Sequence, residues 1–562
     1  MVKFAVTFIS ISLLLGLVPF SFFEVQAQQR RQINIEGADQ MRNLKRNGQD
    51  IRRLIGNVRI RHEDVTVTCD SLYDYSGTNR FDAFGNVVVI QKSSTLYGDT
   101  LLFDGNSKNG RVRGDIVRLV DEEATLVTKF LDFNTQNNTV YFFNGGIINT
   151  NDSRFSSQRG TYHSNQKYFV FAGDVSYLSP DLLLNTDSLN YNSNTEIISF
   201  FGPTRIYNEE NYLYCESGWH NRVEEKSEFR VNAYLNNGEQ RIFGDKIYYD
   251  RILGYSEIIG NGCIIDSAQN MILYGNEIEY YQETEYAEVR KNPLAISISE
   301  EGDSLFLRAD VFIGMAVKDS VVSDSTLYNL VKGIGDVRFY RSDFQGICDS
   351  MVFHSTDSIL YMYNDPILWN EDNQLSANNI DIVFKDDNIH KMLFKGSAFV
   401  VSQEDTIRFN QIRGREMVGF FKNGALTRLD VNGNGETVYF ARDKGVISAV
   451  NKAEGSRLTI TLRDNAVVSI MFREKPIATL FPIDKAELQD VMLKGFSWQI
   501  EKRPTSNESI IPEGLNPNFY IQIENKAKLY RAKKQNPAES VDSSGLNYKL
   551  LKVIEENKVI LN

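Results

Sequence analysis

The sequence has few of the residues that interrupt β-strands or bind metals. Its 562 residues include 11 Pro, 4 Cys and 5 His. Proline cannot donate the hydrogen bond that a central strand needs, so its scarcity leaves room for long runs of strand. The histidines lie far apart, at positions 62, 163, 220, 354 and 390, and no CxxC motif is present. No zinc-ligand spacing appears, and we expect neither a metal nor a cofactor.

Excess positive charge and long apolar runs are also missing from the body of the chain. The formal net charge is -12, which argues against nucleic acid as a partner, because binding to phosphates needs a basic face. After residue 30 no segment approaches the roughly 18 consecutive apolar residues of a membrane helix.

The first 27 residues have the pattern of an export signal. Lys3 precedes an apolar stretch from Phe4 to Val18, and Val25-Gln26-Ala27 forms a small-residue cleavage site. The mature chain would begin at Gln28. An uncleaved anchor helix is the alternative, because apolar residues continue to Phe23, although Pro19 favours cleavage.

What the sequence has in quantity is strand-forming residues. Hydrophobic residues make up 42% and aromatic residues 12% of the chain, with 27 Tyr and 35 Phe. Alternation such as Val65-Thr66-Val67-Thr68 is typical of a strand with one buried face, and helical periodicity is absent between about residues 50 and 480. The sequence therefore predicts an all-β protein.

Two motifs recur with a period of about 29 to 32 residues. The first is a glycine followed by Asn or Asp and an apolar residue, as in Gly56-Asn57-Val58, Gly85-Asn86-Val87, Gly114-Asp115-Ile116, Gly173-Asp174-Val175 and Gly335-Asp336-Val337. The second places an acid before an apolar residue and an aromatic one, as in Asp70-Ser71-Leu72-Tyr73, Asp187-Ser188-Leu189-Asn190-Tyr191 and Asp349-Ser350-Met351-Val352-Phe353. The glycines predict turns or bulges, and repeated units of two or three strands predict a stacked β architecture.

This repeated pattern, after a signal peptide, resembles the OstA-like family of lipopolysaccharide-transport proteins, which includes the periplasmic bridge LptA and the N-terminal domain of LptD. The resemblance covers about residues 33 to 400. It implies an open-ended β-jellyroll that holds lipid acyl chains in its apolar interior and stacks end to end between two membranes. The implied partners are lipopolysaccharide or a related glycolipid and other OstA-like or Lpt proteins, joined by edge-strand pairing, in the periplasm or at the outer membrane.

Changes in pattern suggest the domain limits. Met315 to Gly333 interrupts the repeat and separates a first OstA-like jellyroll region at 28–314 from a second at 333–405. The signal peptide at 1–27 precedes them. The turn signals Asn423-Gly424 and Asn432-Gly433-Asn434-Gly435 predict a hairpin-rich region at 406–482. In 483–562 we expect a short helix at about 485–494, from Asp484, Glu487 and the spacing of Leu488, Val491 and Met492, followed by a polar tail with one weak terminal helix.

The interior of the jellyroll is the expected lipid site. Its predicted lining is Val87, Val89, Leu101, Phe103, Phe130 and Phe142, which would serve both as core and as groove. Arg59, Arg61, Arg111 and Arg113 lie in the most basic part of the chain and are candidates to face lipid phosphates. The alternative is a solvated face balanced by Glu63, Asp64 and Asp115.

The cysteines and the acids both have structural interpretations. Cys69, Cys215 and Cys348 each precede an acid and a serine, so they fill one repeat position and are expected to be small buried residues rather than disulfide partners. The acids, such as Asp70, Asp99 and Asp245, recur at expected turns, where they would cap backbone amides. No GxSxG, HExxH or Walker motif appears in a fitting context.

The sequence therefore favours a non-enzymatic, periplasmic lipid-binding scaffold for lipopolysaccharide transport and outer-membrane assembly. An outer-membrane β-barrel or assembly component is the first alternative, and a carbohydrate-active β-helix enzyme is the second. We also expect the strand at Ile33 to Asp39, which lacks proline, to be an edge open to pairing.

Overall fold

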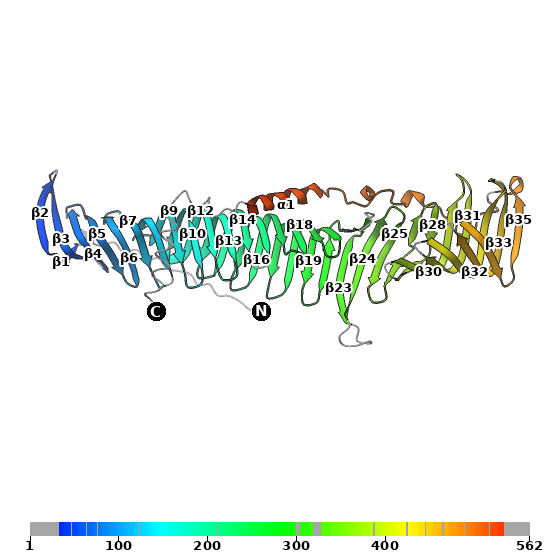
Figure 1. The fold of residues 1–562 in the computed structure, drawn as a ribbon, viewed down its shortest axis with the longest axis horizontal. Coiled ribbons are helices and arrows are strands. Elements are labelled where there is room, and N and C mark those ends of the chain that lie inside the picture. The colour runs from blue at the N-terminus through cyan, green and yellow to red at the C-terminus, as the bar shows by residue number, and fades with distance from the viewer. Residues whose placement is uncertain are drawn as a thin grey trace, which may run out of the picture. The chain divides into compact units, whose positions relative to one another are not determined.

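A computed structural model describes residues 33–532, apart from residues 47, 63, 76, 123, 209–210, 299–303, 319–326, 386–387, 423–424, 444, 464–465, 488 and 516 (Figure 1). The expected signal peptide and cleavage site lie outside the described residues. The chain divides into two compact units, Met1–Val112 and Arg113–Asn562. We call them unit 1 and unit 2.

Unit 1 is built from antiparallel strands that pair in chain order. They are β1 (Asn34–Gly37), β2 (Gln40–Arg46), β3 (Gln49–His62), β4 (Val65–Tyr75), β5 (Arg80–Gln91), β6 (Ser94–Asp104) and the start of β7 (Asn109–Val120). Both β1 and β2 pair with β3, β3 pairs with β4, and so on to β6.

Unit 2 continues with strands and one α-helix among its described residues. Its strands are β8 (Thr125–Asn134), β9 (Thr139–Asn149), β10 (Arg154–Ser157), β11 (Arg159–His163), β12 (Tyr168–Leu178), β13 (Leu183–Asn192), β14 (Ile197–Tyr207), β15 (Tyr212–Asn221), β16 (Lys226–Asn236), β17 (Gln240–Asp250), β18 (Tyr255–Asp266), β19 (Met271–Tyr281), β20 (Tyr286–Arg290), β21 (Leu294–Ser297), β22 (Leu305–Arg308), β23 (Val311–Lys318), β24 (Leu327–Tyr340), β25 (Gln345–His354), β26 (Ile359–Tyr363), β27 (Ile367–Asn370), β28 (Asn373–Ser376), β29 (Asn379–Lys385), β30 (Asn388–Gln403), β31 (Phe409–Lys422), β32 (Ala425–Asp443), β33 (Val446–Arg463), β34 (Ala466–Arg473) and β35 (Ile477–Pro482). Short 3-10 turns lie at η1 (Ser164–Gln166), η2 (Ile483–Lys485), η3 (Ile500–Lys502) and η4 (Asn507–Ser509), and the helix is α1 (Pro517–Ala532). The all-β prediction is confirmed.

The repeated glycine motif forms a corner inside a strand. At Gly85 and Asn86 the backbone φ angles are +76° and +45°, and the pairing of β5 with β4 and β6 shifts by one step there. Asp70 of β4 packs on this glycine, and Asn86 Nδ2 donates to Asp70 Oδ2 at 2.9 Å. A Cβ atom on residue 85 would lie 2.3 Å from that carboxylate oxygen, so only glycine fits.

The same corner recurs along both units. Positive φ angles and a packed side chain are found at Gly202 on Asp187, Gly260 on Asp245 and Gly433 on Arg415, where the side chain comes from the neighbouring strand. They are also found at Gly56 on Asp39, Gly335 on Asp310 and Gly396 on Asn378, where it comes from a bend between two short strands. The repeated acids therefore act at corners within strands rather than at hairpin turns. The sequence Asn432 to Gly435 is such a corner inside β32, and the turn predicted there is wrong; the predicted Asn423-Gly424 turn lies outside the described residues.

Each corner splits its strand between two half-sheets. In β30, Met392 and Phe394 precede the corner and Val400 and Ser402 follow it, yet all four line one cavity. The two half-sheets of unit 2 therefore face each other across an interior. We call half-sheet A the one that holds Val400 and Ser402, and half-sheet B the other. Side chains alternate between the interior and the outer surface of each half-sheet, as the period of two requires.

A C-terminal segment, which we call the strap (residues 483–532), covers the outer surface of half-sheet A. The interior side chains Val400 and Ser402 alternate with Phe399 and Val401, which pack against the strap together with Val438, Phe440 and Val450. From the strap come Val491, Leu493, Phe496 and Trp498. One layer of backbone thus separates the interior from the strap.

Two buried glutamines hold the strap by its backbone, and a third binds one of its side chains. Gln411 donates to the carbonyl of Val491 at 3.1 Å and accepts from the N–H of Leu493 at 2.9 Å. Gln374 makes the same pair of bonds with Ser497 and Gln499, both at 2.7 Å. Gln345 accepts from Arg503 Nε at 2.8 Å. Each amide side chain extends the sheet's hydrogen bonding to a segment that is not a strand.

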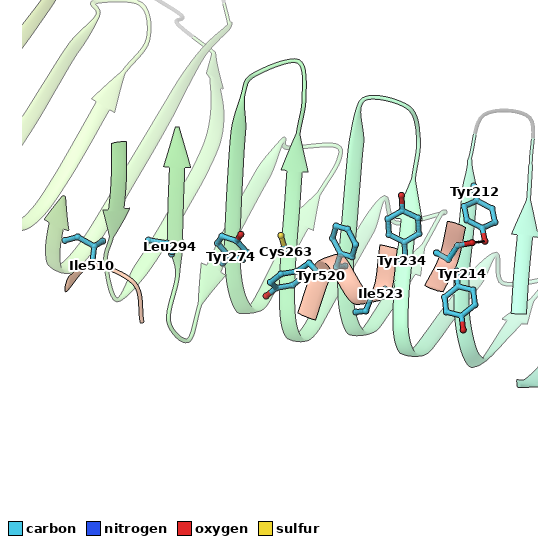
Figure 2. Close-up of a cluster of buried hydrophobic side chains, with 11 residues drawn as sticks. Tyr212, Tyr214, Tyr234, Cys263, Tyr274, Leu294, Ile510, Tyr520 and Ile523 are labelled. Carbon is cyan, nitrogen blue, oxygen red and sulfur yellow. Dashed lines mark hydrogen bonds between the residues drawn. The ribbon is translucent and has the colours of Figure 1, made fainter. Parts of the chain in front are cut away.

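The helix α1 completes the strap over β14 to β19, beside which it lies in Figure 1. Tyr520 packs its ring on those of Phe243 and Tyr274, with centroids 5.6 and 5.3 Å apart. Ile523 and Ala527 are buried in the same cluster, together with Tyr212, Tyr214, Tyr234, Cys263 and Leu294 (Figure 2). At the rim, Tyr212 Oη donates to the carbonyl of Ala527 at 2.7 Å and Arg205 donates to that of Tyr530 at 2.9 Å.

The helix predicted at 485–494 is wrong. Residues 483–485 form a 3-10 turn, and the described residues from 486 to 494 are extended or turn. Val491 and Leu493 are both buried while Met492 between them is half-buried, which is the spacing of an extended segment. The bonds to Gln411 hold that conformation.

Two further findings bear on the expected organisation. β23 and β24 pair on either side of the interruption at 315–333, of which residues 319–326 lie outside the description. The module boundary expected there stays a prediction.

Within the part of the chain that the structure describes, no helix is long and apolar enough to cross a membrane.

Candidate functional site

A cavity of about 650 Å³ lies in unit 2 between the two half-sheets. Half-sheet A contributes Phe339, Leu375, Val400 and Ile412, and half-sheet B contributes Met351, Leu360, Ile382, Phe384, Ile389, Met392, Phe394, Phe421, Leu426, Leu429, Ile460, Leu462, Val467 and Ile470. Leu305 and Leu307 of β22 also line it. Its size and its apolar lining are those of a site for a hydrophobic ligand.

Polar residues gather along one edge of this cavity. They lie at or near the hairpin ends of half-sheet A and comprise Arg341, Asp343, Asn370, Glu371, Asn373, Ser402 and Asn410. Asn388 is the polar lining residue at the opposite edge. A ligand with an apolar body and a polar head would place its head on half-sheet A's edge.

The charges near this edge are held in local pairs. Arg341 Nε lies 2.6 Å from Asp343, and Arg408 Nη1 lies 3.0 Å from Asp405. The backbone N–H of Ile407 donates to Asp405 at 3.0 Å, and this bond, with the Arg408 guanidinium, holds the pKa of that carboxyl below its usual range. Asp405 is therefore charged at neutral pH.

The structure places the predicted lining residues in the interior for the most part. Val87, Leu101 and Phe142 are 1%, 1% and 3% exposed, and Val89 is half-buried on the same side of β5 as Val87. Phe103 is half-buried and packs on Phe81, with ring centroids 5.3 Å apart. These side chains already pack closely against their neighbours.

Phe130, by contrast, points to the outer surface of the sheet and not into the interior. It pairs across strands with Phe143, while the adjacent Leu131 pairs with Phe142, so Phe130 and Phe142 lie on opposite surfaces of the sheet. The Arg113 guanidinium lies 5.6 Å from the Phe130 ring and 2.6 Å from Asp132. Phe130 belongs to this outer cluster rather than to the interior.

The candidate phosphate-facing arginines lie outside the interior. Arg59 and Arg61 are exposed and alternate with the buried Val58 and Ile60, and Arg111 is exposed as well. Arg59 Nε lies 2.8 Å from Glu36. The pairing of Arg59 and Arg113 with carboxylates favours the alternative of a balanced, solvated face.

All four cysteines are buried and none is bridged. Burial raises the pKa of the Cys69 thiol to about 11 and that of Cys348 to about 12. At neutral pH they are protonated and unreactive, as expected of small buried residues.

A family model described as OstA-like protein matches residues 30–185 and 179–245. The sequence is OstA-like over this range. The crystal structure of LptH, the LptA-homologous periplasmic component of the lipopolysaccharide transport device of Pseudomonas aeruginosa, is similar over 24% of this chain and 81% of that chain, with 15% identity and a TM-score of 0.14. No curated protein sequence matches the chain.

The cavity lies beyond the OstA-like match, and none of its lining residues was predicted. The corners Gly396 and Gly433 continue the OstA-like pattern of Gly56 and Gly85 up to the cavity. Following that pattern along the chain would have extended the expected interior to β32.

Proposed function

We propose that this OstA-like chain is a non-enzymatic, periplasmic lipid-binding scaffold of lipopolysaccharide transport. The observation that carries the proposal is the apolar cavity between the half-sheets of unit 2. The OstA-like sequence of residues 30–245 supports the assignment to lipid transport.

An acyl chain suits this cavity for a physical reason. Each methylene moved from water to an apolar surface contributes about 0.8 kcal/mol. The cavity walls are nearly all aliphatic or aromatic, while polar side chains lie at its edges. Such a cavity holds the chain and leaves the polar head near water.

The first test fills the cavity. Ile389 lines it and is half-buried, whereas the next residue, His390, is exposed. We expect Ile389→Trp to weaken binding of a fluorescent monoacylglycerol about tenfold or more, since the ring would occupy the space of several methylenes. His390→Trp is the matched control and should bind as the unmodified chain does.

A photoreactive residue at the same two positions gives an independent readout. Cross-linking of extracted lipopolysaccharide from position 389 but not from 390 supports the proposal. Equal binding by both tryptophan variants, with both folded by circular dichroism, would show that the cavity is not the lipid site.

The β-helix enzyme alternative has less support. Every described strand pairing for which register is known is antiparallel, as in β30 with β31, whereas a coiled β-helix stacks parallel strands.

A further inference from the structure

An ion pair joins the edges of the two half-sheets in the N-terminal part of unit 2. The strand pairing from β10 to β30 places the hairpin 150–153 at the edge of half-sheet A and the hairpin 222–225 at the edge of half-sheet B. Arg222 Nη2 lies 2.5 Å from Asp152 Oδ2. The Arg222 guanidinium holds the pKa of that carboxyl below its usual range, so both groups are charged at neutral pH. We call this pair the clasp.

The clasp connects segments that are not neighbours in the sheet. β9 and β10 pair with each other and with β8, β11 and β12, whereas β15 and β16 pair with each other and with β14 and β17. Separating the two hairpins therefore breaks no hydrogen bond between strands. The Asp152 side chain is 50% exposed, and an ion pair this open to water adds little stability.

Next to the clasp, aromatic rings from both half-sheets fill the interior. Phe155 of half-sheet A packs on Phe171 and Tyr191 of half-sheet B, with ring centroids 5.0 and 5.2 Å apart. It also contacts Tyr177 of half-sheet A, with centroids 4.8 Å apart. All four side chains are buried. An acyl chain can occupy this part of the interior only if the rings move apart, because their contacts leave no room between the half-sheets.

Hydrogen bonds connect these rings to the clasp. The Tyr177 hydroxyl lies 3.3 Å from the Ser153 hydroxyl, which donates to Asp152 at 2.8 Å. On the other half-sheet, Arg222 donates to the Tyr191 hydroxyl. One interior tyrosine is therefore bound to each side of the clasp. A movement that separates Asp152 from Arg222 also draws Tyr177 away from Tyr191.

The edges beside the cavity of unit 2 are arranged differently. Their charges pair within one hairpin, as Arg341 does with Asp343 and Arg408 with Asp405. The interior there holds a space of about 650 Å³. Edges joined across the interior thus coincide with a filled interior, and edges with local pairs coincide with an open one.

We propose that the clasp is a gate that controls the entry of acyl chains into the interior between β10 and β13. With Asp152 and Arg222 paired, the aromatic rings exclude the chain. When the pair separates, the rings part and the chain takes their place. The inference rests on the proposed function and assigns control of access to residues outside the cavity.

The test measures lipid inside the gated segment of the full chain. Leu189 lies opposite Phe171 on β13 and is buried, so a small diazirine residue at position 189 reports contact with extracted lipopolysaccharide by cross-linking. We expect Asp152→Asn with Arg222→Gln to raise this cross-linking about threefold or more, which is the change in equilibrium expected from the loss of one such ion pair. Cross-linking from position 389 in the cavity should not change.

A second ion pair at the edge of half-sheet B gives the matched control. Arg251 Nε lies 3.5 Å from Glu225, and both residues belong to hairpins of this one half-sheet. Arg251→Gln with Glu225→Gln removes an edge ion pair that does not join the two half-sheets. Cross-linking from position 189 should match that of the unmodified chain.

A reversible lock separates gating from a loosened fold. Asp152→Cys with Arg222→Cys allows a short, reducible thiol-specific linker to bridge the two edges, while the four native cysteines are buried and protonated. We expect the bridged chain to return to the cross-linking level of the unmodified chain at position 189, and reduction of the linker to raise it again. Circular dichroism checks that each variant is folded.

The outcomes separate the two proposals. If cross-linking from position 189 is the same in the clasp variant and the unmodified chain, or in the bridged and reduced chains, the clasp is a structural ion pair and not a gate. Cross-linking from position 389 in those same chains keeps the proposed function. If no variant cross-links lipid from position 389, the proposed function fails and the inference fails with it.

Discussion

At the scale of single residues, the corner glycines determine where each strand bends. We predict that Gly85→Ala destabilises unit 1 by at least about 2 kcal/mol, because a left-handed backbone costs an L-residue about 1–2 kcal/mol and the new methyl group would overlap Asp70. Hydrogen exchange of β4 and β5 should report the loss locally.

Gly77→Ala is the control for this prediction. A Cβ atom there meets no atom within 4 Å and the φ angle is not left-handed, so stability should change by less than about 1 kcal/mol. Equal exchange in the two variants would show that the corner does not require glycine. Adding Asp70→Ala to Gly85→Ala should restore part of the loss.

Gln411 is the second residue whose role can be isolated. It is 1% exposed, and its amide satisfies the carbonyl of Val491 and the N–H of Leu493. We predict that Gln411→Leu costs about 2–4 kcal/mol, because two buried backbone groups lose their partners, and that residues 489–499 become sensitive to protease. Gln403→Leu, at an exposed position, should leave that segment protected.

At the scale of elements, α1 is held by ion pairs that depend on pH. Burial raises the pKa of Glu216, but hydrogen bonds from Lys526 and Asn232 outweigh burial, and the pKa lies below its usual range. A carboxyl with a lowered folded-state pKa stabilises the fold above its unfolded pKa, and this contribution is lost as the pH falls through the folded-state value. Glu524, bonded to Lys528 and Arg241, behaves in the same way.

We therefore predict that α1 loosens before the strands as the pH is lowered below the unfolded pKa of Glu, about 4.3. Hydrogen exchange of residues 517–532 against β15 to β19 measures it. In a chain with Glu216→Gln and Glu524→Gln, α1 should already be looser at pH 7 and should lose most of its extra acid sensitivity. An α1 that stays as protected as β17 down to pH 3.5 would contradict the prediction.

The elements also show what the sequence could reveal. The strands and their corners follow from local signals, namely alternation and a glycine before Asn or Asp, and the sequence predicted turns or bulges at these glycines. At Gly433 it predicted a hairpin turn, and the structure has a corner inside β32. The strap was missed because its conformation comes from residues 80 or more positions away, such as Gln411 with Val491. The helical spacing of Tyr520, Ile523 and Ala527 was present in the sequence and would have located α1. The cavity was missed because it depends on which side chains leave space unfilled, and no local pattern records that.

At the scale of the whole molecule, pairing between copies or with other OstA-like proteins depends on open strand edges. β1 pairs with β3 in unit 1, with Ile35 opposite Ile60. We predict that Ile35→Pro weakens association with an OstA-like partner, because proline removes a donor and blocks an added strand. Sedimentation measures the association and thermal melting measures the fold.

The two measurements separate edge docking from simple closure of unit 1. A lower melting temperature with unchanged association, or a chain that is monomeric and binds no partner, would contradict docking. Thr66→Pro in β4, which pairs on both sides with β3 and β5, should instead lower stability severely.

The strap has a consequence for how the chain is made. Tyr212 donates a hydrogen bond to the carbonyl of Ala527, which lies 315 positions later in the sequence. Synthesis therefore delivers the tyrosine-rich outer surface of β15 to β19 long before its cover. During that interval the nascent chain exposes an apolar surface that invites chaperones or aggregation, and only a chain translated through α1 can bury it. The burial of this surface is thus coupled to the translation of residues 483–532.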